Sequence, residues 1–206
     1  MPHPMGDFSY TWPLYLGAAL AYLLGSIPFG LVLTRLAGLG DLRKLGSGNI
    51  GATNVLRTGN RKLAALTLLL DAGKGAVAVL IAEQFGPDMA ALAAACAFLG
   101  HVFPIWLGFR GGKGIATSGG ILLVYLWPVG LLTLATWLVV AVASRYSSLA
   151  ALVAAVLAPV YTWLLTREFQ PTEVVLFLAI VIILRHLGNI GRLIRGEESR
   201  IRLSRR

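Results

Sequence analysis

The chain has 206 residues, of which 57% are hydrophobic and 13% are charged. This composition excludes an ordinary soluble domain and a disordered chain. The formal net charge of +9 would suit a nucleic-acid-binding protein. However, the basic residues gather at the ends of apolar runs, where they orient membrane helices and contact anionic lipids. We therefore expect membrane lipids, and no nucleic acid, as partners.

Six apolar runs of about membrane-spanning length follow one another along the chain. They cover residues 11–36, 63–83, 89–107, 115–143, 148–166 and 172–190. The fourth run is longer than one straight span needs, and Trp127-Pro128 interrupts it, because proline breaks a helix. We therefore divide it into helices over 115–126 and 128–144. The prediction is an all-α, polytopic integral membrane protein with seven transmembrane helices, in a single domain over residues 1–206.

The distribution of charge supports seven spans over the alternative of six with a kinked fourth run. With a periplasmic N-terminus and seven spans, nearly all Lys and Arg residues fall on the cytoplasmic side, which also holds the C-terminus. Three polar segments then meet at the cytoplasmic face, namely residues 43–57, 108–117 and 185–192. None of them contains aspartate or glutamate, which suits a site for an anion.

The first polar segment alternates glycines with small polar residues between basic ones. Glycine lets backbone N–H groups approach a ligand, and arginine binds phosphate or carboxylate through two hydrogen bonds. The candidate anion ligands are Arg43, Gly46, Ser47, Gly48, Asn49, Thr53, Asn54 and Arg57. Residues 46–51 match the pattern GxGxxG, but that pattern binds dinucleotides only after a β-strand. We therefore reject a dinucleotide site.

The second segment resembles part of a phosphate-binding Walker A loop. That motif requires a glycine where this chain has Leu107, and a Ser or Thr where it has Gly114. ATP binding is therefore not expected, but backbone N–H groups, a lysine and a helix N-terminus still predict a phosphate site. Its candidate residues are Gly111, Gly112, Lys113, Gly114 and Thr117. A flexible turn that anchors the topology is the alternative.

The third segment places His186 and Asn189 on one helix face, because they are three residues apart. Arg185 and Arg192 flank them and could bind an anion. His186 could donate to a phosphate or act as an acid or base. A structural role for this histidine at the membrane interface is the alternative.

Three further polar residues lie within apolar runs, and we expect each to be structural. Asp71 and Lys74 are spaced to neutralise one another inside the second run, and His101 is expected to make a hydrogen bond at a helix end. Three histidines and one cysteine make no metal site, and no Ser-His-Asp triad is visible. The sequence therefore predicts no metal, no cofactor and no strong nucleophile.

At these residues the chain resembles the bacterial acyl-phosphate:glycerol-3-phosphate acyltransferases of the PlsY type. The matching motifs are residues 46–54 with Arg57, residues 100–104 leading into 111–117, and Arg185-His186 with Asn189, Arg192, Gly196 and Glu198. The likeness covers about residues 14–200, with the three motifs in the order of the family.

The resemblance implies a multi-pass enzyme of the bacterial inner membrane, with its active site on the cytoplasmic face. Such an enzyme transfers an acyl group from acyl phosphate, without acyl-CoA, to the 1-hydroxyl of glycerol 3-phosphate. The products are lysophosphatidic acid and phosphate, in phospholipid synthesis, and no cofactor is used. Functional coupling to an acyl-phosphate-forming enzyme is a further expectation.

The resemblance also implies roles for individual residues. Ser47, Arg57, Lys113, His186 and Asn189 are expected to be catalytic, and Glu198 mainly structural. Where the family commonly has arginine and glutamate between the histidine and the asparagine, this chain has Leu187 and Gly188. That departure changes the local contacts of the third motif.

The chemistry suits these residues, because acyl phosphate is already activated and needs no covalent enzyme intermediate. The enzyme must bring two phosphorylated substrates together and stabilise developing negative charge. Either His186 or an oxygen of the acyl phosphate could take the proton of the attacking hydroxyl. The alternative function is an organic-phosphate transporter, which would place its site near the bilayer midplane and often shows two related halves. The polar motifs instead lie at one face, without an internal repeat.

Overall fold

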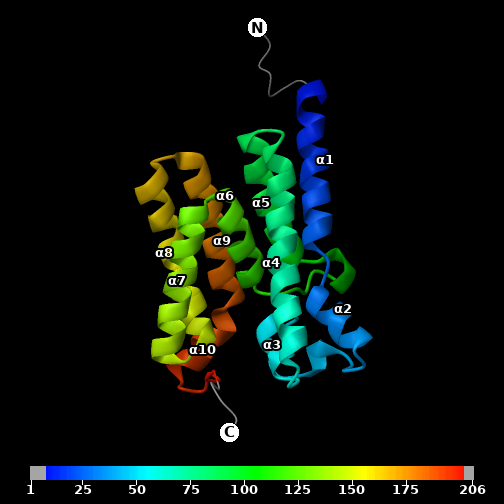
Figure 1. Ribbon diagram of the computed structural model, residues 1–206, viewed down its shortest axis with the longest axis vertical. Helices are drawn as coiled ribbons and strands as arrows, with labels where there is room; N and C mark the ends of the chain where they lie inside the picture. Colours follow the sequence, from blue (N-terminus) through cyan, green and yellow to red (C-terminus); the bar gives the residue numbers. More distant parts are fainter. Residues whose placement is uncertain (1–7, 202–206) are drawn as a thin grey trace. The chain divides into compact units, whose positions relative to one another are not determined.

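The computed structural model describes residues 8–201, and these residues form helices and loops without a β-strand. The predicted all-α class is therefore confirmed. The chain divides into two compact units, Met1–Tyr125 and Leu126–Arg206 (Figure 1). The single-domain organisation stays a prediction. The predicted periplasmic N-terminus, and the last arginines of the tail, lie outside the described residues.

The first unit is built around two long helices, α4 and α5. Its elements are α1 (Phe8–Gly25), α2 (Phe29–Leu36), the 3-10 turn η2 (Leu42–Lys44), α3 (Ala52–Leu56), α4 (Arg61–Glu83), α5 (Pro87–Val102), the 3-10 turn η3 (Ile105–Leu107) and α6 (Ile115–Tyr125). Both α1 and α6 pack against α4 and α5. Glycines at the crossings let the helices approach closely. A Cβ at Gly25 would meet the Ala97 backbone, and one at Gly120 would meet the Ala72 carbonyl.

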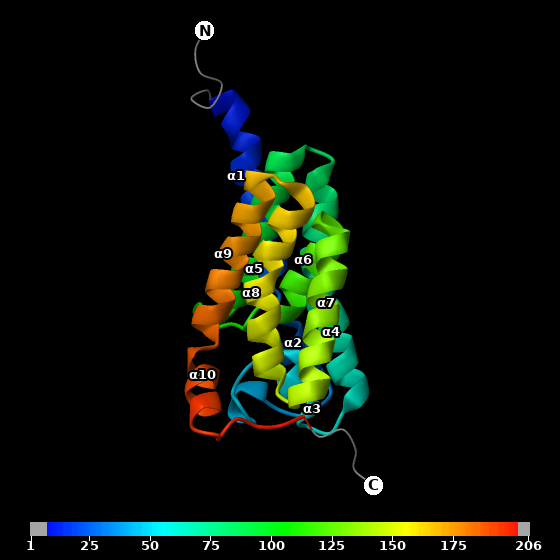
Figure 2. The same ribbon diagram turned by 90° about the vertical axis from the view of Figure 1, so that its left-hand side faces the viewer.

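The second unit is a three-helix bundle with a short terminal helix. It contains α7 (Trp127–Ser144), α8 (Ser147–Thr166), α9 (Phe169–Arg185) and α10 (Leu187–Ile194). Helix α8 packs against both α7 and α9, and its contacts are made by a stripe of buried alanines. Helix α10 turns away from α9 by 57° at His186 and packs on α8 and α9 (Figure 2).

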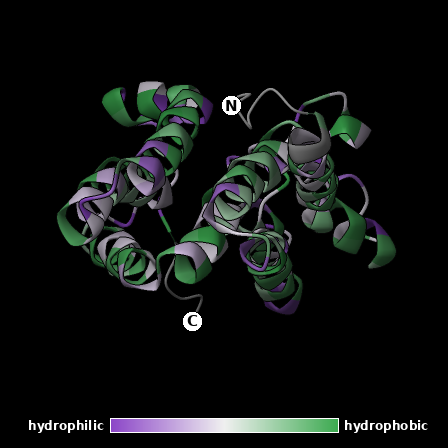
Figure 3. Ribbon diagram, turned by 90° about the horizontal axis from the view of Figure 1, so that it is seen from above, coloured by the Kyte–Doolittle hydropathy of each residue, from purple (hydrophilic) through white to green (hydrophobic). Residues whose placement is uncertain are grey.

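Within residues 8–201, five helical segments are long and apolar enough to cross a membrane, or six if the bent pair α9–α10 counts as one span. These five are Thr11–Leu36, Arg61–Glu83, Pro87–Leu107, Trp127–Ser144 and Ser147–Thr166. Hydrophobic residues run along the helices of both units (Figure 3), and many large apolar side chains are exposed; Leu69, for example, is 68% exposed. A multi-pass membrane protein accounts for this surface, because lipid solvates apolar side chains that water would not.

The predicted division of the fourth apolar run is confirmed. Helix α6 ends at Tyr125 and α7 begins at Trp127. Pro128 lies in the first turn of α7, where the missing backbone N–H costs no hydrogen bond. Helix α6 has 11 residues and is shorter than a usual span.

Candidate active site

The first polar segment folds around one buried side chain, Asn54. Its Oδ1 accepts a hydrogen bond from the Ser47 backbone N–H at 3.2 Å. Its Nδ2 donates to the carbonyls of Leu42, Leu45 and Asn49 at 3.1, 3.0 and 2.8 Å. The Asn54 side chain therefore holds the loop before α3 in shape. This differs from its predicted role as a phosphate ligand, because its amide is used inside the protein.

This loop brings Arg57 beside the glycine that precedes Ser47. Gly46 has φ 54°, and a Cβ there would come within 2.8 Å of Arg57 Cδ and would also clash with Asn54 Oδ1. A side chain at residue 46 would therefore displace Arg57, and glycine at this position avoids that clash. Ser47 and Gly48 are exposed on this loop and Asn49 is half-buried, whereas Thr53 is exposed on α3 and Arg57 at its C-terminal end. The structure thus brings together the serine and the arginine of the first motif.

Arg43, which the sequence predicts as an anion ligand, already has an anionic partner. Its guanidinium donates to Asp41 from Nη2 at 2.6 Å and from Nε at 3.0 Å. These side-chain bonds, together with the Arg43 backbone N–H, hold the pKa of the Asp41 carboxyl well below its usual range. Asp41 lies two residues before Arg43 and just outside the segment, which is why inspection of the segment alone missed it.

Asn54 provides a test of the loop. We expect Asn54→Asp to lower turnover at least tenfold and to destabilise the protein by about 2 kcal/mol, because a carboxylate would face three carbonyl oxygens without a proton to donate. Turnover and thermal unfolding in detergent measure the two effects. The matched control is Asn60→Asp, because Asn60 caps α4 through an acceptor oxygen at 3.0 Å from the Leu63 N–H and aspartate caps equally well. An Asn54→Asp protein that behaves like the control would contradict this role.

The second segment returns over the C-terminal end of α5. The N–H groups of Gly111 and Gly112 donate to the carbonyls of Val102 and His101, each at 3.1 Å. These N–H groups are therefore engaged within the protein. The remaining predicted donors are Lys113, which is half-buried, and the N–H groups at Gly114 and in the first turn of α6. Thr117, also a predicted ligand, has a fully buried side chain.

The glycines of this segment allow the loop to lie against α5. A Cβ at Gly112 would meet the His101 imidazole, and one at Gly114 would meet the Phe98 ring. Gly114 also has φ 83°, a conformation that favours glycine. The spacing of these glycines is therefore explained by contact with α5, in addition to any contact with a ligand.

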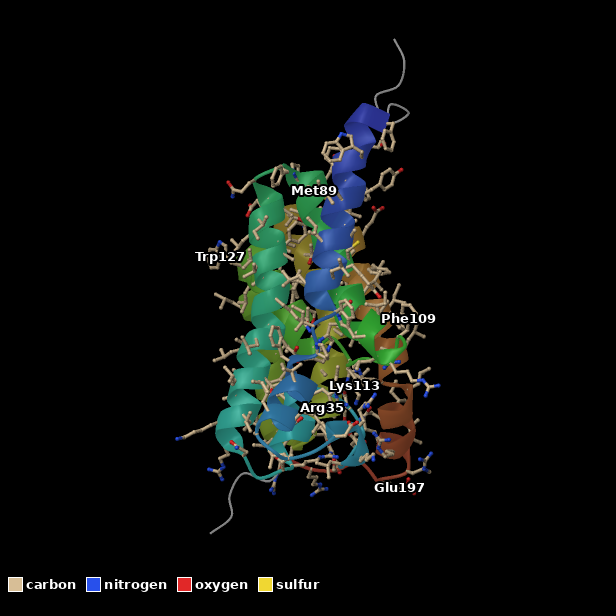
Figure 4. The ribbon with its side chains drawn as sticks, turned by 90° about the vertical axis from the view of Figure 1, so that its right-hand side faces the viewer. Arg35, Met89, Phe109, Lys113, Trp127 and Glu197 are labelled. Atoms are coloured by element: carbon tan, nitrogen blue, oxygen red, sulfur yellow. The ribbon has the colours of Figure 1, made fainter. Side chains whose placement is uncertain are left out.

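One hydrophobic cluster joins the first two segments. Leu107, just before the glycine-rich loop, packs against a buried cluster that includes Val55 of the first segment and Leu42 just before that segment, together with Leu31 and Ala64. Lys113 and Arg35 lie toward the same end of the first unit, away from Met89 (Figure 4). The structure therefore brings the first and second motifs together within this unit.

The third motif lies in the second unit, at the bend between α9 and α10. His186 is 2% exposed, and its Nδ1 lies 2.8 Å from the Ile182 carbonyl oxygen. Because a carbonyl only accepts, Nδ1 carries the proton, which makes Nε2 the basic nitrogen of the neutral ring. Arg185, the predicted anion ligand before it, is half-buried.

Glu198 joins the residues of the third motif through hydrogen bonds. Its carboxylate accepts hydrogen bonds from Asn189 Nδ2 and Arg192 Nε, both at 2.7 Å, and from Ser148 Oγ at 2.9 Å. Sequence inspection missed Ser148, because it is 50 residues away in the chain. Burial raises the pKa of the Glu198 carboxyl, but the three hydrogen bonds outweigh burial and hold that pKa below its usual range.

Glu198 gives a pH-dependent prediction. A folded-state pKa below the ordinary 4.5 means that the carboxylate stabilises the fold above about pH 4.5, and that this stability is lost as the pH falls through the folded pKa. We expect Glu198→Gln to lower the unfolding temperature by a few degrees at neutral pH, and the difference to shrink in acid. Glu197→Gln is the control, because its ion pair with Arg195 is exposed. A difference independent of pH would contradict the account.

The comparisons with known proteins agree with this fold and these motifs. A sequence model of the family described as glycerol-3-phosphate acyltransferase matches residues 15–196. The glycerol-3-phosphate acyltransferase of Mesorhizobium japonicum is 56% identical over 93% of this chain and 97% of its own length. That of Cereibacter sphaeroides is 59% identical over 91% of this chain and 90% of its own length.

The fold has also been seen in solved structures. The crystal structure of PlsY (YgiH), an integral membrane glycerol 3-phosphate acyltransferase, in its glycerol 3-phosphate form, superposes with a TM-score of 0.88 at 36% identity, covering 92% of this chain and 96% of that one. Its lysophosphatidic acid form gives a TM-score of 0.85 at 34% identity. The protein is therefore an integral membrane acyltransferase. It belongs to the PlsY-type family of glycerol-3-phosphate acyltransferases.

Proposed function

We propose that this enzyme transfers an acyl group from acyl phosphate to the 1-hydroxyl of glycerol 3-phosphate, releasing phosphate and lysophosphatidic acid. The observation that carries the proposal is the pairing of two loops on one hydrophobic cluster. One loop presents Ser47 and Arg57, and the other presents Lys113. The PlsY structures in glycerol 3-phosphate and lysophosphatidic acid forms support the acceptor and the product.

The proposal extends to the placement of the enzyme in the inner membrane. Seven spans, with α1–α2 counted as one and α6 as a short span, would put the N-terminus in the periplasm and the C-terminus in the cytoplasm. All three motifs would then lie on the cytoplasmic side of the membrane. A cysteine at exposed Lys62 should resist an impermeant maleimide in intact spheroplasts, whereas one at exposed Gln84 should react. The reverse pattern would contradict this orientation.

In the reaction, the hydroxyl oxygen attacks the acyl carbonyl carbon and the bond from that carbon to the phosphate oxygen breaks. Phosphate leaves with the electron pair of that bond. Arg57 and Lys113 would offset the repulsion between the two phosphorylated substrates, and Asn189 and His186 would position phosphate. The hydroxyl proton goes either to an oxygen of the acyl phosphate or to His186 Nε2, the nitrogen that the contact with Ile182 leaves basic.

The test of this function compares acyl donors. Purified enzyme with glycerol 3-phosphate should release phosphate when acyl phosphate is added, and should show no turnover with acyl-CoA or acyl carrier protein. Release that requires either thioester donor, or no release at all, would contradict the proposal. An organic-phosphate transporter would instead move labelled glycerol 3-phosphate into proteoliposomes without consuming acyl phosphate.

A further inference from the structure

A buried cluster of charged side chains lies within the first unit, between α4 and α5. Asp71, Lys74 and His101 are 2%, 4% and 4% exposed. Lys74 Nζ lies 3.0 Å from Asp71 Oδ1, so the predicted ion pair forms. His101 Nδ1 lies 3.6 Å from the same oxygen, which is a charge contact and too long for a strong hydrogen bond. One carboxylate therefore contacts both nitrogen groups.

The lysine of this cluster also ties α4 to the break between α1 and α2. Lys74 Nζ donates to the Ile27 carbonyl at 2.7 Å and lies 5.7 Å from the centre of the Phe29 ring. Ionised groups inside a membrane protein are costly and tend to mark functional sites. Apolar packing of similar volume would often be more stable than such a buried pair. Stability alone therefore does not explain this cluster.

The histidine of the cluster supports the glycine-rich loop directly. The His101 carbonyl accepts the Gly112 N–H at 3.1 Å, and the next carbonyl, of Val102, accepts the Gly111 N–H. Gly112 is buried so closely against the imidazole that a Cβ there would collide with Nε2. The next residue along the loop is Lys113. The position of the imidazole thus determines where the backbone that carries Lys113 can lie.

We propose that Asp71, Lys74 and His101 position the loop that carries Lys113, and thereby set the affinity of the site for the phosphate of glycerol 3-phosphate. This inference rests on the proposed function of Lys113. The three residues are positioning residues, because they act through the loop. A displacement of about 1 Å in such a loop can cost on the order of 10²-fold in rate, which gives a reason to hold it with a buried ionic cluster.

The test compares two replacements of His101. In His101→Asn the amide nitrogen takes the place of Nδ1 opposite Asp71, whereas His101→Leu fills the space without a polar atom. We expect the leucine variant to raise KM for glycerol 3-phosphate about tenfold or more with a smaller change in kcat, and the asparagine variant to stay within about threefold of the parent. Thr67→Val is the matched control, because Thr67 is fully buried on α4 and donates within its own helix, to Leu63.

A second readout needs no turnover, so it separates this inference from the proposed function. Amide hydrogen exchange at Gly111 and Gly112 should be faster in His101→Leu than in His101→Asn or Thr67→Val, because the loop opens more often. The double variant Asp71→Asn/Lys74→Met, which leaves no unpaired buried charge, should also raise KM and speed this exchange. Parental KM and exchange in the leucine and double variants would overturn the inference. So would equal losses in the leucine, asparagine and Thr67 variants.

Discussion

Replacing Arg57 by alanine is expected to lower kcat/KM by about 10²- to 10³-fold, which corresponds to about 3–4 kcal/mol of transition-state stabilisation. The guanidinium lies beside Gly46 on the loop that Asn54 holds in place, and it is exposed where a phosphate can reach it. Steady-state kinetics with both substrates varied measures the effect.

Two controls make the Arg57 prediction specific. Arg61→Ala removes an exposed arginine at the start of α4 and should change kcat/KM less than about twofold, because it lies outside the motif and exposed charges contribute little. Arg57→Lys keeps the charge but loses the two-pronged geometry, and should recover only part of the activity. A fully active Arg57→Ala enzyme would show that this arginine lies outside the site.

Replacing Lys113 by alanine is expected to have an effect of similar size, about 10²- to 10³-fold in kcat/KM. Lys113 follows two glycines whose N–H groups are bound to the end of α5, so these two backbone donors are already used within the protein and the Lys113 ammonium supplies positive charge beside them. The unfolding temperature should change little, because the loop geometry depends on the glycines and on His101. Enzyme kinetics and thermal unfolding of the same preparation measure the two quantities.

Two control replacements test whether the loss of activity is specific to Lys113. Lys62→Ala removes a different lysine of the first unit, one that is exposed, and should leave turnover near the parental value. Cys96→Ala should do the same, because Cys96, on α5, packs against an alanine-rich cluster contributed by α1, α4 and α5. If Lys113→Ala kept parental kinetics, the glycine-rich loop would be a structural turn, which is the alternative that the sequence left open.

The helices were predictable from sequence because their signals are local. Apolar runs mark α4, α5 and α8, and Trp127-Pro128 marks the start of α7 within a few residues. The bend between α9 and α10 was not predicted, since the sixth apolar run was extended to residue 190, across the polar residues at the start of the third segment. The number of spans rests on the asymmetry of charge between the two sides of the membrane. Helix length alone does not give it, because α6 has only 11 residues.

The sequence predicts which residue types make up the site, but it does not predict which hydrogen bonds those residues make. The sequence predicts Asn54 and Gly112 as phosphate ligands, but Asn54 donates to three carbonyls of its own loop and Gly112 donates to the His101 carbonyl. Hydrogen-bond partners depend on how the chain returns on itself, which a single segment does not reveal. The contact of Glu198 with Ser148, across a separation of 50 residues, is of the same kind.

We propose that one protein couples acyl-phosphate cleavage to acylation of glycerol 3-phosphate. The most direct measurement follows phosphate and lysophosphatidic acid together, in one reaction of the purified enzyme with acyl phosphate and labelled glycerol 3-phosphate. The account predicts that both products appear at the same rate and in equal amounts, and that Lys113→Ala slows both alike. Phosphate release without lysophosphatidic acid, or acylation only after acyl-CoA is added, would contradict it.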